Sequence, residues 1–492
     1  MTGNEFARRQ QRVGKVPTSI RFWQAIGAWP NTFKDIAFNT FLLFYYSQLL
    51  GMPATMASIA LAIALAVDAI SDPLVGSFSD NLKSAKGRRH PLMYWAAAPL
   101  GFFLWLIFMP PAGLDDWGLF AWLLGTVMGA RLALTFFSVP WNALFSEFTD
   151  DYDERTQIIT WRWAIGWGGG LAFGWVGMTF IFPSSDTYEF GQFNIGAYPL
   201  YGAVLGIAVA LSAFATTYMT RKEVPYLYEN KSADTFGLRN AAREIGLALR
   251  NRNFLRLFLS IFIGAMVVGT NEALSLFMNT YFWGLRPEDL RWFGFAIIGA
   301  VIAFAAVPTI QLRFDKKTII VFVIAFLVLN GMAIVSLRLL DVLPPNGSSA
   351  LLWILVVNTT LRAGLATAMG IIFGSMVADV LDDQQLKTGK RQEGVFNAAL
   401  SFSGKLTSGF GVIVGGLVLD YVVKIPSATD PSAVDPNAVL RLGVTDALIV
   451  PLFLLPILWW MGNYRITRAR QQEIRQALDA RGTQDKTDDP AA

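Results

Sequence analysis

Residues 68–91 read DAISDPLVGSFSDNLKSAKGRRHP. They begin inside an apolar run, 54–79, that carries two aspartates, Asp68 and Asp72, and they end in a cluster of basic residues. About 20 apolar residues are enough for a helix to cross the ~30 Å hydrocarbon core of a membrane. Lysine and arginine beside such a run mark its cytoplasmic end. The stretch therefore predicts a charged spanning helix that ends at a cytoplasmic loop.

The same alternation of apolar runs and polar loops continues in both directions along the chain. Of the 492 residues, 54% are hydrophobic and only 15% are charged, whereas about 25% are charged in an average soluble domain. This composition is typical of a polytopic α-helical membrane protein. We expect twelve spanning helices, at residues 27–49, 54–79, 91–110, 117–145, 158–182, 197–219, 254–283, 292–311, 318–340, 349–378, 395–423 and 443–463.

The basic residues predict how these helices are oriented. If both termini are cytoplasmic, and if Arg256 and Arg338 near span ends are counted with the adjoining loops, 30 of the 40 lysines and arginines lie in inside segments, five lie in outside loops and five lie within spans. This asymmetry follows the positive-inside rule. We therefore expect a multi-pass protein of the cytoplasmic (inner) membrane, in contact with the lipid bilayer, with its N- and C-termini in the cytoplasm.

The longest inside loop divides the chain into two halves of six helices. Within it, GLRNAAREIGLALRN predicts a helix at the membrane interface, with a solvated linker as the alternative. The halves echo each other, because SEFTDDYDERT after the fourth span aligns with SMVADVLDDQQ after the tenth. The expected parts are a cytoplasmic N-terminus, an N-terminal bundle, a linker, a C-terminal bundle and a cytoplasmic tail, at 1–26, 27–219, 220–253, 254–463 and 464–492.

Missing residue types exclude several classes of protein. The chain has no cysteine and a single histidine, His90, which argues against disulfides, Cys/His zinc sites and Ser-His-Asp catalysis. No G-x-x-x-x-G-K-[ST] run is present to bind a nucleotide. We expect a protein that is not an enzyme and that needs no cofactor beyond a coupling ion. Its partners are expected to include neither nucleic acid nor an obligate protein.

Asp68 and Asp72 are the sharpest feature within a span. Residues four apart share one face of a helix, and a charged residue at mid-span costs about 2.5–3.5 kcal/mol. Two partly dehydrated carboxylates this close repel, so either one is protonated or a cation lies between them. Ser71 and Thr135 offer neutral oxygens of the kind that a hard cation accepts. These four residues predict a site for Na⁺ or H⁺.

The alternative for this pair is a fixed salt bridge from Asp68 or Asp72 to Arg131 or Lys405. Glu272 and Arg362 are further charges within predicted spans, both in the second half. Such residues normally face a partner or a cavity. Arg131, Glu272 and Arg362 are therefore candidates for pairs that gate the protein or brace it, and the sequence leaves open which pairs with which.

Two groups of residues predict a polar solute. In the first span, Asp35 can accept from vicinal hydroxyls and Lys34 can donate, with an interfacial pair at the membrane edge as the alternative. In the fourth span, Ser138, Trp141 and Asn142 add a hydroxyl, a ring for a sugar face and a carboxamide. Ordinary helix packing is the alternative for this second group.

The basic loop that follows the second span predicts a gate. It begins at Asp80 and contains Arg88 and Arg89. These charges can pair with acidic helix ends, such as Glu147 or Asp150, in one conformation and release them in another, as a protein that alternates between two states requires. The alternative is a plain topology anchor.

Four stretches carry a resemblance to a known family. They are DAISDPLVGSFSDNLKSAKGRRHP (68–91), VPWNALFSEFTDDYDERT (139–156), SMVADVLDDQQLKTGKRQEGVF (375–396) and SFSGKL (401–406). The chain resembles the glycoside-pentoside-hexuronide:cation symporter family over nearly all of its length. The resemblance implies an all-α major facilitator fold with two six-helix bundles, and secondary transport driven by an ion gradient.

The resemblance also implies roles for individual residues. It makes Asp68 and Asp72 the cation carboxylates and places Thr135 where the family can supply a hydroxyl to that site. Lys34 and Asp35 match a sugar-contacting pair of the family. Lys405 matches a functionally important lysine in the eleventh span, and Arg162 matches an arginine near the sugar.

Three positions depart from the family pattern. Ser138 stands where melibiose-type members carry an aspartate, Asn142 where they carry a tryptophan, and Leu65 where they carry an arginine. The lost carboxylate argues against a galactoside. We therefore expect symport of Na⁺ or H⁺ with a small solute, a sugar or glycoside, and the alternative is an amphipathic solute such as a lysolipid or a drug-like molecule.

Overall fold

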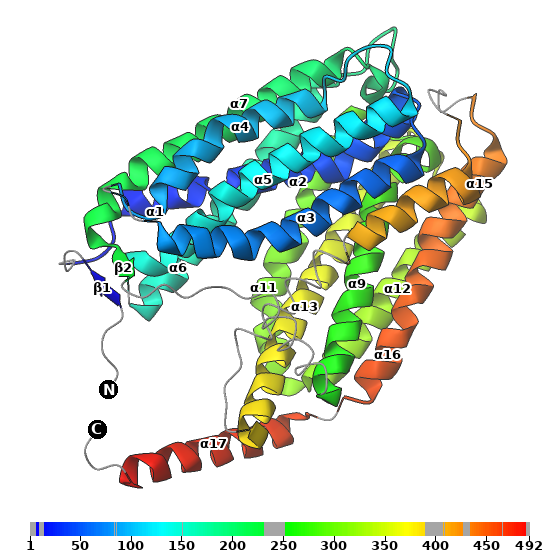
Figure 1. The fold of residues 1–492 in the computed structure, drawn as a ribbon. Helices are drawn as coiled ribbons and strands as arrows, with labels where there is room; N and C mark the ends of the chain where they lie inside the picture. The colour runs from blue at the N-terminus through cyan, green and yellow to red at the C-terminus, as the bar shows by residue number, and fades with distance from the viewer. Residues whose placement is uncertain are drawn as a thin grey trace. The chain divides into compact units, whose positions relative to one another are not determined.

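The computed structural model describes residues 6–8, 14–82, 84, 86–149, 151–230, 251–388, 407, 409–426, 433–464 and 466–488. These residues are helical apart from short connections and one two-stranded antiparallel ribbon (Figure 1). In the ribbon β1 (Phe6–Arg8) pairs with β2 (Tyr228–Asn230), with Phe6 opposite Asn230. The ribbon therefore ties the start of the described chain to the segment that follows α7 (Ala197–Thr220).

The chain forms two compact units, which we call unit 1 and unit 2. Unit 1 comprises Met1–Phe236, Glu272–Gly294 and Val412–Ala438, and unit 2 comprises Gly237–Asn271, Phe295–Gly411 and Val439–Ala492. The predicted bundles, 27–219 and 254–463, divide the chain at one point only. In the structure, two segments from the second half of the sequence pack with the first half.

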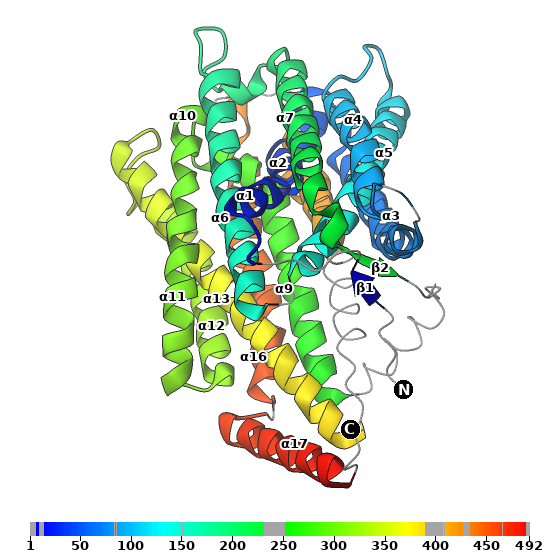
Figure 2. The same ribbon diagram turned by 90° about the vertical axis from the view of Figure 1, so that its left-hand side faces the viewer.

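Unit 1 is built around four long helices. α3 packs against α5, and α4 packs against α5 and α7, so that these helices lie side by side in Figure 1. α1 and α2 pack against α6 and α7, and Figure 2 shows α1 lying beside α6. The remaining bounds are α1 (Thr18–Ile26), α2 (Trp29–Ile36), α3 (Ala54–Asn81), α4 (His90–Ile107), α5 (Asp116–Phe148), α6 (Tyr152–Val176) and α10 (Pro287–Leu290).

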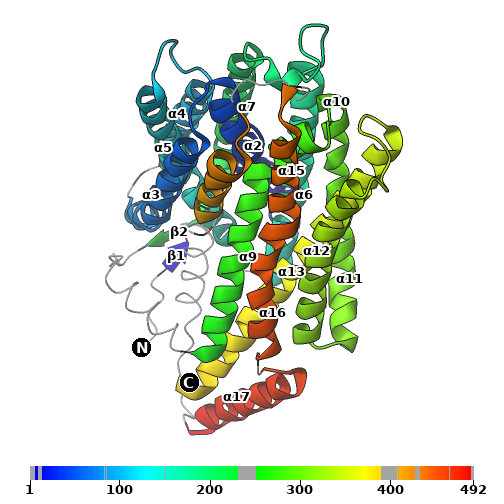
Figure 3. The ribbon, with the colours of Figure 1, turned by 90° about the vertical axis from the view of Figure 1, so that its right-hand side faces the viewer.

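Unit 2 contains α11, α12, α13, α16 and α17, together with most of α9 (Figure 3). α13 packs against α11 and α12, and α17 packs against the end of α13. The bounds are α9 (Arg252–Phe277), α11 (Ala296–Arg313), α12 (Lys316–Leu339), α13 (Ser349–Thr388), α15 (Pro436–Val444), α16 (Leu455–Gly462) and α17 (Arg468–Asp488). The core is aliphatic and aromatic, with Phe254, Ile320, Ile372 and Ile457 fully buried.

Short stretches of π- or 3₁₀-helix extend several of these helices. The π segments are η1 (Ala37–Leu42), η2 (Tyr45–Leu49), η3 (Gly177–Ile181), η6 (Met278–Phe282), η8 (Val418–Val423) and η10 (Thr445–Ile449). The 3₁₀ segments are η4 (Gly191–Phe193), η5 (Arg221–Tyr226), η7 (Arg291–Phe295) and η11 (Val450–Leu454). Such irregular turns often occur at functional sites.

Aspartates set the starts of two helices in unit 1. Asp115 precedes α5 and its carboxylate accepts a hydrogen bond from the Gly118 amide at 2.8 Å. Asp151 precedes α6 and accepts from the Glu154 amide at 2.8 Å. Each cap satisfies an amide that a helix leaves free in its first turn. The acidic stretch that the sequence repeats in both halves thus begins a helix in the first half.

Ten helices in the described part of the chain are long and apolar enough to cross a membrane. Large apolar side chains are exposed on their outer faces, including Trp95 (83%), Trp459 (69%) and Leu312 (73%). A soluble protein would not expose so many apolar side chains to water. The chain is therefore a multi-pass membrane protein, as the composition predicts.

Two of the twelve predicted spans are not among these ten. The first, 27–49, is helical from residue 29 to residue 49 through α2, η1 and η2, and a turn at Gly27–Ala28 separates this helix from α1, which precedes the predicted span. The turn is followed by Pro30 in the first turn of α2, which has no amide hydrogen to continue the preceding helix. Of the eleventh, 395–423, the structure describes the apolar helix Gly409–Val423. Most of the predicted interfacial helix in 220–253 lies outside the described residues, as does Lys405.

Candidate functional site

The four residues predicted to bind the cation come together between α3 and α5. The Thr135 hydroxyl oxygen lies 2.9 Å from Asp68 Oδ1 and 3.0 Å from Asp72 Oδ1. Ser71 Oγ lies 3.5 Å from the same hydroxyl and 3.2 Å from the Asp68 carbonyl oxygen. Thr135 and Ser71 are both buried. The i, i+4 spacing thus places both carboxylates toward one buried hydroxyl.

The Thr135 hydroxyl cannot donate to both carboxylates at once. A hydroxyl carries one hydrogen, so only one of the two close oxygen–oxygen contacts is a donated bond from Thr135. The other contact is favourable only if the second carboxyl carries a proton or if a cation lies among the oxygens. Two carboxylates with neutral hydroxyls are also a donor set that suits a hard cation. The geometry therefore fits Na⁺ or H⁺.

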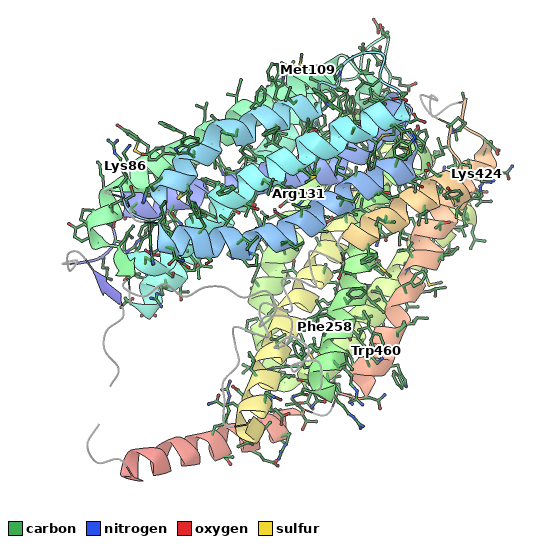
Figure 4. All side chains as sticks on the ribbon, in the orientation of Figure 1. Lys86, Met109, Arg131, Phe258, Lys424 and Trp460 are labelled. Atoms are coloured by element: carbon green, nitrogen blue, oxygen red, sulfur yellow. The ribbon has the colours of Figure 1, made fainter. Side chains whose placement is uncertain are left out.

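Arg131 places a positive charge beside this cluster. It lies one turn before Thr135 on α5, is 8% exposed, and its Nη1 is 3.3 Å from Asp68 Oδ2 (Figure 4). Its charge also acts on Asp72 and Asp35. Arg131 therefore offsets the charge of Asp68. The salt bridge that the sequence offered as an alternative thus coexists with the shared hydroxyl.

The Lys34–Asp35 pair lies on α2 and is linked to the same region. Lys34 and Asp35 form an ion pair, in which Lys34 is buried and the Asp35 side chain is 56% exposed. Lys34 Nζ and the Arg131 guanidinium each lie 5.7 Å from the centre of the Phe38 ring. Both are within the range of a cation–π interaction. One ring therefore links the candidate solute pair to the arginine of the cation cluster.

The fourth-span residues form a second cluster with Arg162 of α6. The Arg162 guanidinium stacks 3.8 Å above the Trp141 ring, and its Nη2 donates to Asn142 Oδ1 at 2.5 Å. Asn142 is exposed, while Ser138, one turn earlier, is half-buried. The guanidinium occupies one face of the Trp141 ring, and Trp141 is buried. Asn142 and Arg162 are therefore the accessible polar groups of this cluster.

Trp141 is fixed by a residue that the sequence did not indicate. Its indole N–H donates to the Gln24 carbonyl oxygen at 2.9 Å, and Gln24 Nε2 donates back to the Trp141 carbonyl oxygen at 3.0 Å. A side chain at Gly27 would collide with the indole. The break between α1 and α2 therefore makes room for Trp141. No pattern of charge or spacing distinguishes Gln24 in the sequence.

The basic loop meets the end of α5. Arg88 Nη2 lies 2.8 Å from Glu147 Oε1, and Arg89 Nη2 lies 3.0 Å from the same oxygen. Arg89 also lies 2.6 Å from Asp80 and donates to Ser79 Oγ at 3.1 Å. Glu147 and Arg89 are both buried. A buried ionic cluster therefore holds the loop at the C-terminal end of α3.

Replacing Glu147 by Gln is expected to lower the free energy of unfolding by about 3 kcal/mol, because the buried Arg89 guanidinium and the partly buried Arg88 guanidinium lose the charge that they share. The matched control is Glu473→Gln, since Glu473 pairs with Arg470 on the surface of α17 and an exposed pair contributes under about 1 kcal/mol. Thermal unfolding of the detergent-solubilised protein checks both. Equal losses in the two variants would contradict the buried cluster.

Glu272 and Arg362, the other charges predicted within spans, lie in different units. Glu272 on α9 belongs to unit 1 and is within electrostatic range of Asp35. In unit 2, the charge of Arg362 on α13 acts on Asp446 in η10, whose Oδ1 is buried without a hydrogen-bond partner among the described residues. Asp446 was missed, although it lies in the predicted span 443–463 and the rule that singled out Arg362 applies to it.

The fold and the site define a class of protein. Many apolar helices with charges held inside them are typical of a multi-pass membrane transporter. The family model described as "MFS/sugar transport protein" matches residues 23–468. The chain belongs to this family of the major facilitator superfamily, which confirms the resemblance to the glycoside-pentoside-hexuronide:cation symporters.

Relatives with assigned names agree with this class. The chain is 25% identical to an uncharacterized symporter of Synechocystis, over 90% of this chain and 93% of that one. It is 24% identical to the isoprimeverose transporter of Lactiplantibacillus pentosus, over 82% and 80%. It is also 24% identical to the sodium-dependent lysophosphatidylcholine symporter 1 of Xenopus tropicalis, over 95% and 91%.

A solved structure supports the fold. The nucleoside transporter NupG superimposes with a TM-score of 0.60 at 16% identity, covering 91% of this chain and all of that one. At this identity the likeness shows the fold alone. The chain therefore has the all-helical major facilitator fold.

Proposed function

We propose that the protein is a symporter that couples the entry of Na⁺ or H⁺ to the transport of a sugar or glycoside. In this proposal twelve helices cross the cytoplasmic membrane in two bundles, and both termini are cytoplasmic. Transport proceeds by alternating access. The ion gradient supplies the energy, and no nucleotide takes part.

The single observation that carries the proposal is the hydroxyl shared by two carboxylates. Thr135 lies within hydrogen-bond distance of both Asp68 and Asp72 and has only one hydrogen to donate. Arg131 beside Asp68 adds a positive charge to the cluster. The contacts of this site are all favourable only when a proton or a cation is bound. The occupancy of such a site depends on the ion concentration, as coupling to an ion gradient requires.

Coupling between ion and solute follows from the position of Arg131. It contacts Asp68, its guanidinium lies over the Phe38 ring, and it is within electrostatic range of Asp35. When a cation neutralises Asp68 and Asp72, the field at Asp35 changes, and so does the strength with which Asp35 accepts hydrogen bonds. The coupling is reciprocal. If bound solute raises the affinity for the cation, bound cation raises the affinity for the solute by the same factor.

The exposed polar groups favour a sugar as the solute. Asp35 presents a carboxylate, and Asn142 and Arg162 present a carboxamide and a guanidinium, all on unit 1. These groups accept from and donate to hydroxyls. The relative that transports isoprimeverose has a sugar as its solute. Lys34 neutralises Asp35 and holds it in place.

A binding experiment tests the solute class. A panel of labelled glycosides is dialysed against the purified protein, with and without Na⁺, at two pH values. Asp35→Asn is expected to weaken glycoside binding by about 10- to 100-fold, which corresponds to the loss of a charged hydrogen-bond acceptor. Asp116→Asn, an exposed carboxylate in the first turn of α5, serves as the control and should leave binding unchanged. A glycoside that binds equally to Asp35→Asn would contradict the assignment.

A lysolipid is the second candidate, because one relative is a lysophosphatidylcholine symporter. The same dialysis with labelled lysophosphatidylcholine distinguishes the two solutes. Cation-dependent binding of the lysolipid without binding of any glycoside would replace the sugar in the proposal. The cation site would remain, since its geometry does not depend on the solute.

A further inference from the structure

An apolar helix from the second half of the sequence packs against the start of α3 in unit 1. This helix, Gly409–Val423, ends in η8. Gly416 and Asp420 lie four residues apart on it and share one face. That face meets the first turns of α3, which is the helix that carries Asp68 and Asp72.

Asp420 caps α3. Its Oδ1 accepts from the Ala54 amide at 3.0 Å, and its Oδ2 accepts from the Thr55 amide at 2.7 Å. The residue before α3 is Pro53, whose side chain has no oxygen to cap the helix itself. A carboxylate at a helix start satisfies free amides and interacts favourably with the helix dipole. The first turn of α3 therefore takes its cap from a residue 366 positions away in the chain.

Gly416 lets the two helices approach closely. A Cβ atom at this position would collide with the Ser58 side chain and the Ala54 carbonyl oxygen. The Thr55 hydroxyl also lies 3.5 Å from the Gly416 carbonyl oxygen. Ser58 is fully buried by this approach. The contact is therefore specific in shape as well as in charge.

Further bonds join the two halves of the sequence within unit 1. Glu288 of α10 accepts from the Ser184 amide at 2.8 Å and from its hydroxyl at 2.9 Å. Tyr281 of η6 donates to Gln48 Oε1 at 2.8 Å. Gln48 lies just before α3 begins. The start of α3 is thus held in a region where the first and second halves of the sequence meet.

The position of this contact gives it a role. α3 has 28 residues, so its start lies about 42 Å from its end at 1.5 Å per residue. The end adjoins the basic loop, which is cytoplasmic in the proposed orientation, and the start is therefore at the outer side. An alternating-access transporter must separate its halves at the outer side to admit a solute from outside.

We propose that Asp420 and Gly416 form an outer latch on the start of α3, which closes the external side and positions the helix that carries the cation carboxylates. The inference rests on the proposed function, because a latch needs a protein that opens outward. Releasing the Ala54 and Thr55 amides from Asp420 frees the start of α3. Opening of the outer side then also moves α3, the helix that carries Asp68 and Asp72.

Thiol labelling tests the latch without any knowledge of the solute. The natural chain has no cysteine, so Ser58→Cys places a single thiol beneath Gly416. In intact cells, a membrane-impermeant maleimide reaches this thiol only when the outer side opens. Adding Asp420→Ala is expected to raise the labelling rate by about tenfold, in line with the loss of a strong helix cap. Asp420→Asn keeps one acceptor oxygen and should give a smaller increase.

Two controls separate latch release from unfolding. Asp115→Ala removes a carboxylate that caps only its own helix, α5, and should leave labelling of the Ser58→Cys reporter unchanged. A second reporter, Ala213→Cys, lies at a fully buried position of α7 and, probed with a membrane-permeant maleimide, should not react in the Asp420→Ala background.

Three results would each overturn the latch. The first is a Ser58→Cys thiol that reacts no faster when Asp420 is replaced, the second is an Ala213→Cys thiol that is accelerated to the same extent, and the third is an effect of Asp115→Ala equal to that of Asp420→Ala. None of these results depends on whether the solute is a sugar or the cation is Na⁺. Failure of the latch is therefore distinguishable from failure of the proposed function.

Discussion

Asp72→Asn is expected to abolish the dependence of solute binding on the cation. The carboxamide keeps the size of the side chain but removes one of the two charges that Thr135 brings together. Asn offers a cation one neutral oxygen in place of a charged carboxylate, while Asp68 remains paired with Arg131. The attraction for a further cation is then lost, and we expect cation affinity to fall by at least about 100-fold, as for the loss of a charge-assisted contact of ~3 kcal/mol.

The measurement is solute affinity over a series of Na⁺ concentrations and pH values. In the wild-type protein the affinity should rise with one of the two cations, and in Asp72→Asn it should be the same under all conditions. Thr135→Val provides a matched variant that removes the shared hydroxyl and keeps both charges, and a smaller loss is expected. A wild-type dependence that survives in Asp72→Asn would contradict the assignment of this carboxylate.

Arg131→Met is expected to have the largest effect on stability. Arg131 is buried and is the positive partner of Asp68, reaching it from α5. Methionine fills similar space but removes the positive charge that pairs with Asp68. Breaking a buried ion pair by removing one partner costs about 3–5 kcal/mol, and we expect a loss at the lower end of this range because Asp68 is only partly buried.

Thermal unfolding in detergent measures this effect. The deficit of Arg131→Met should be smaller in the Asp68→Asn background than in the wild type, because the charge that the arginine pairs with is then absent. Arg313→Met, at the exposed end of α11, is the control and should change little in either background. An equal deficit with and without Asp68→Asn would show that Arg131 acts through packing and not through charge.

Much of the site could be predicted from local rules. Asp68 and Asp72 share a helix face because they are four residues apart, and an apolar span makes their charge conspicuous. Thr135 was expected beside them, and the structure places its hydroxyl between their carboxylates. The sequence left Arg131 and Lys405 as alternative partners, because pairing across helices depends on tertiary packing. The structure pairs Arg131 with Asp68, and Lys405 lies outside the described residues.

Other features could not be predicted from the hydropathy of the sequence. The turn at Gly27–Ala28, at the start of the first span, leaves space that the Trp141 indole fills, and this indole belongs to a helix more than 100 residues away. Gln24 holds that indole through hydrogen bonds that leave no trace in local composition. The cap that Asp420 places on α3 likewise joins two distant segments. Contacts of this kind follow from the fold as a whole and not from any window of sequence.

Cation uptake on solute binding is the most direct test of whether Asp68, Asp72 and Thr135 form the coupling site. A saturating solute is added to the purified protein, and the cation bound is measured as radioactive sodium retained or as protons taken up from weakly buffered solution. We expect an uptake of up to one cation per chain in the wild type, and none in the double variant Asp68→Asn/Asp72→Asn. Solute binding without uptake of either cation by the wild type, or equal uptake by the double variant, would contradict the assignment of Asp68, Asp72 and Thr135 as the coupling site.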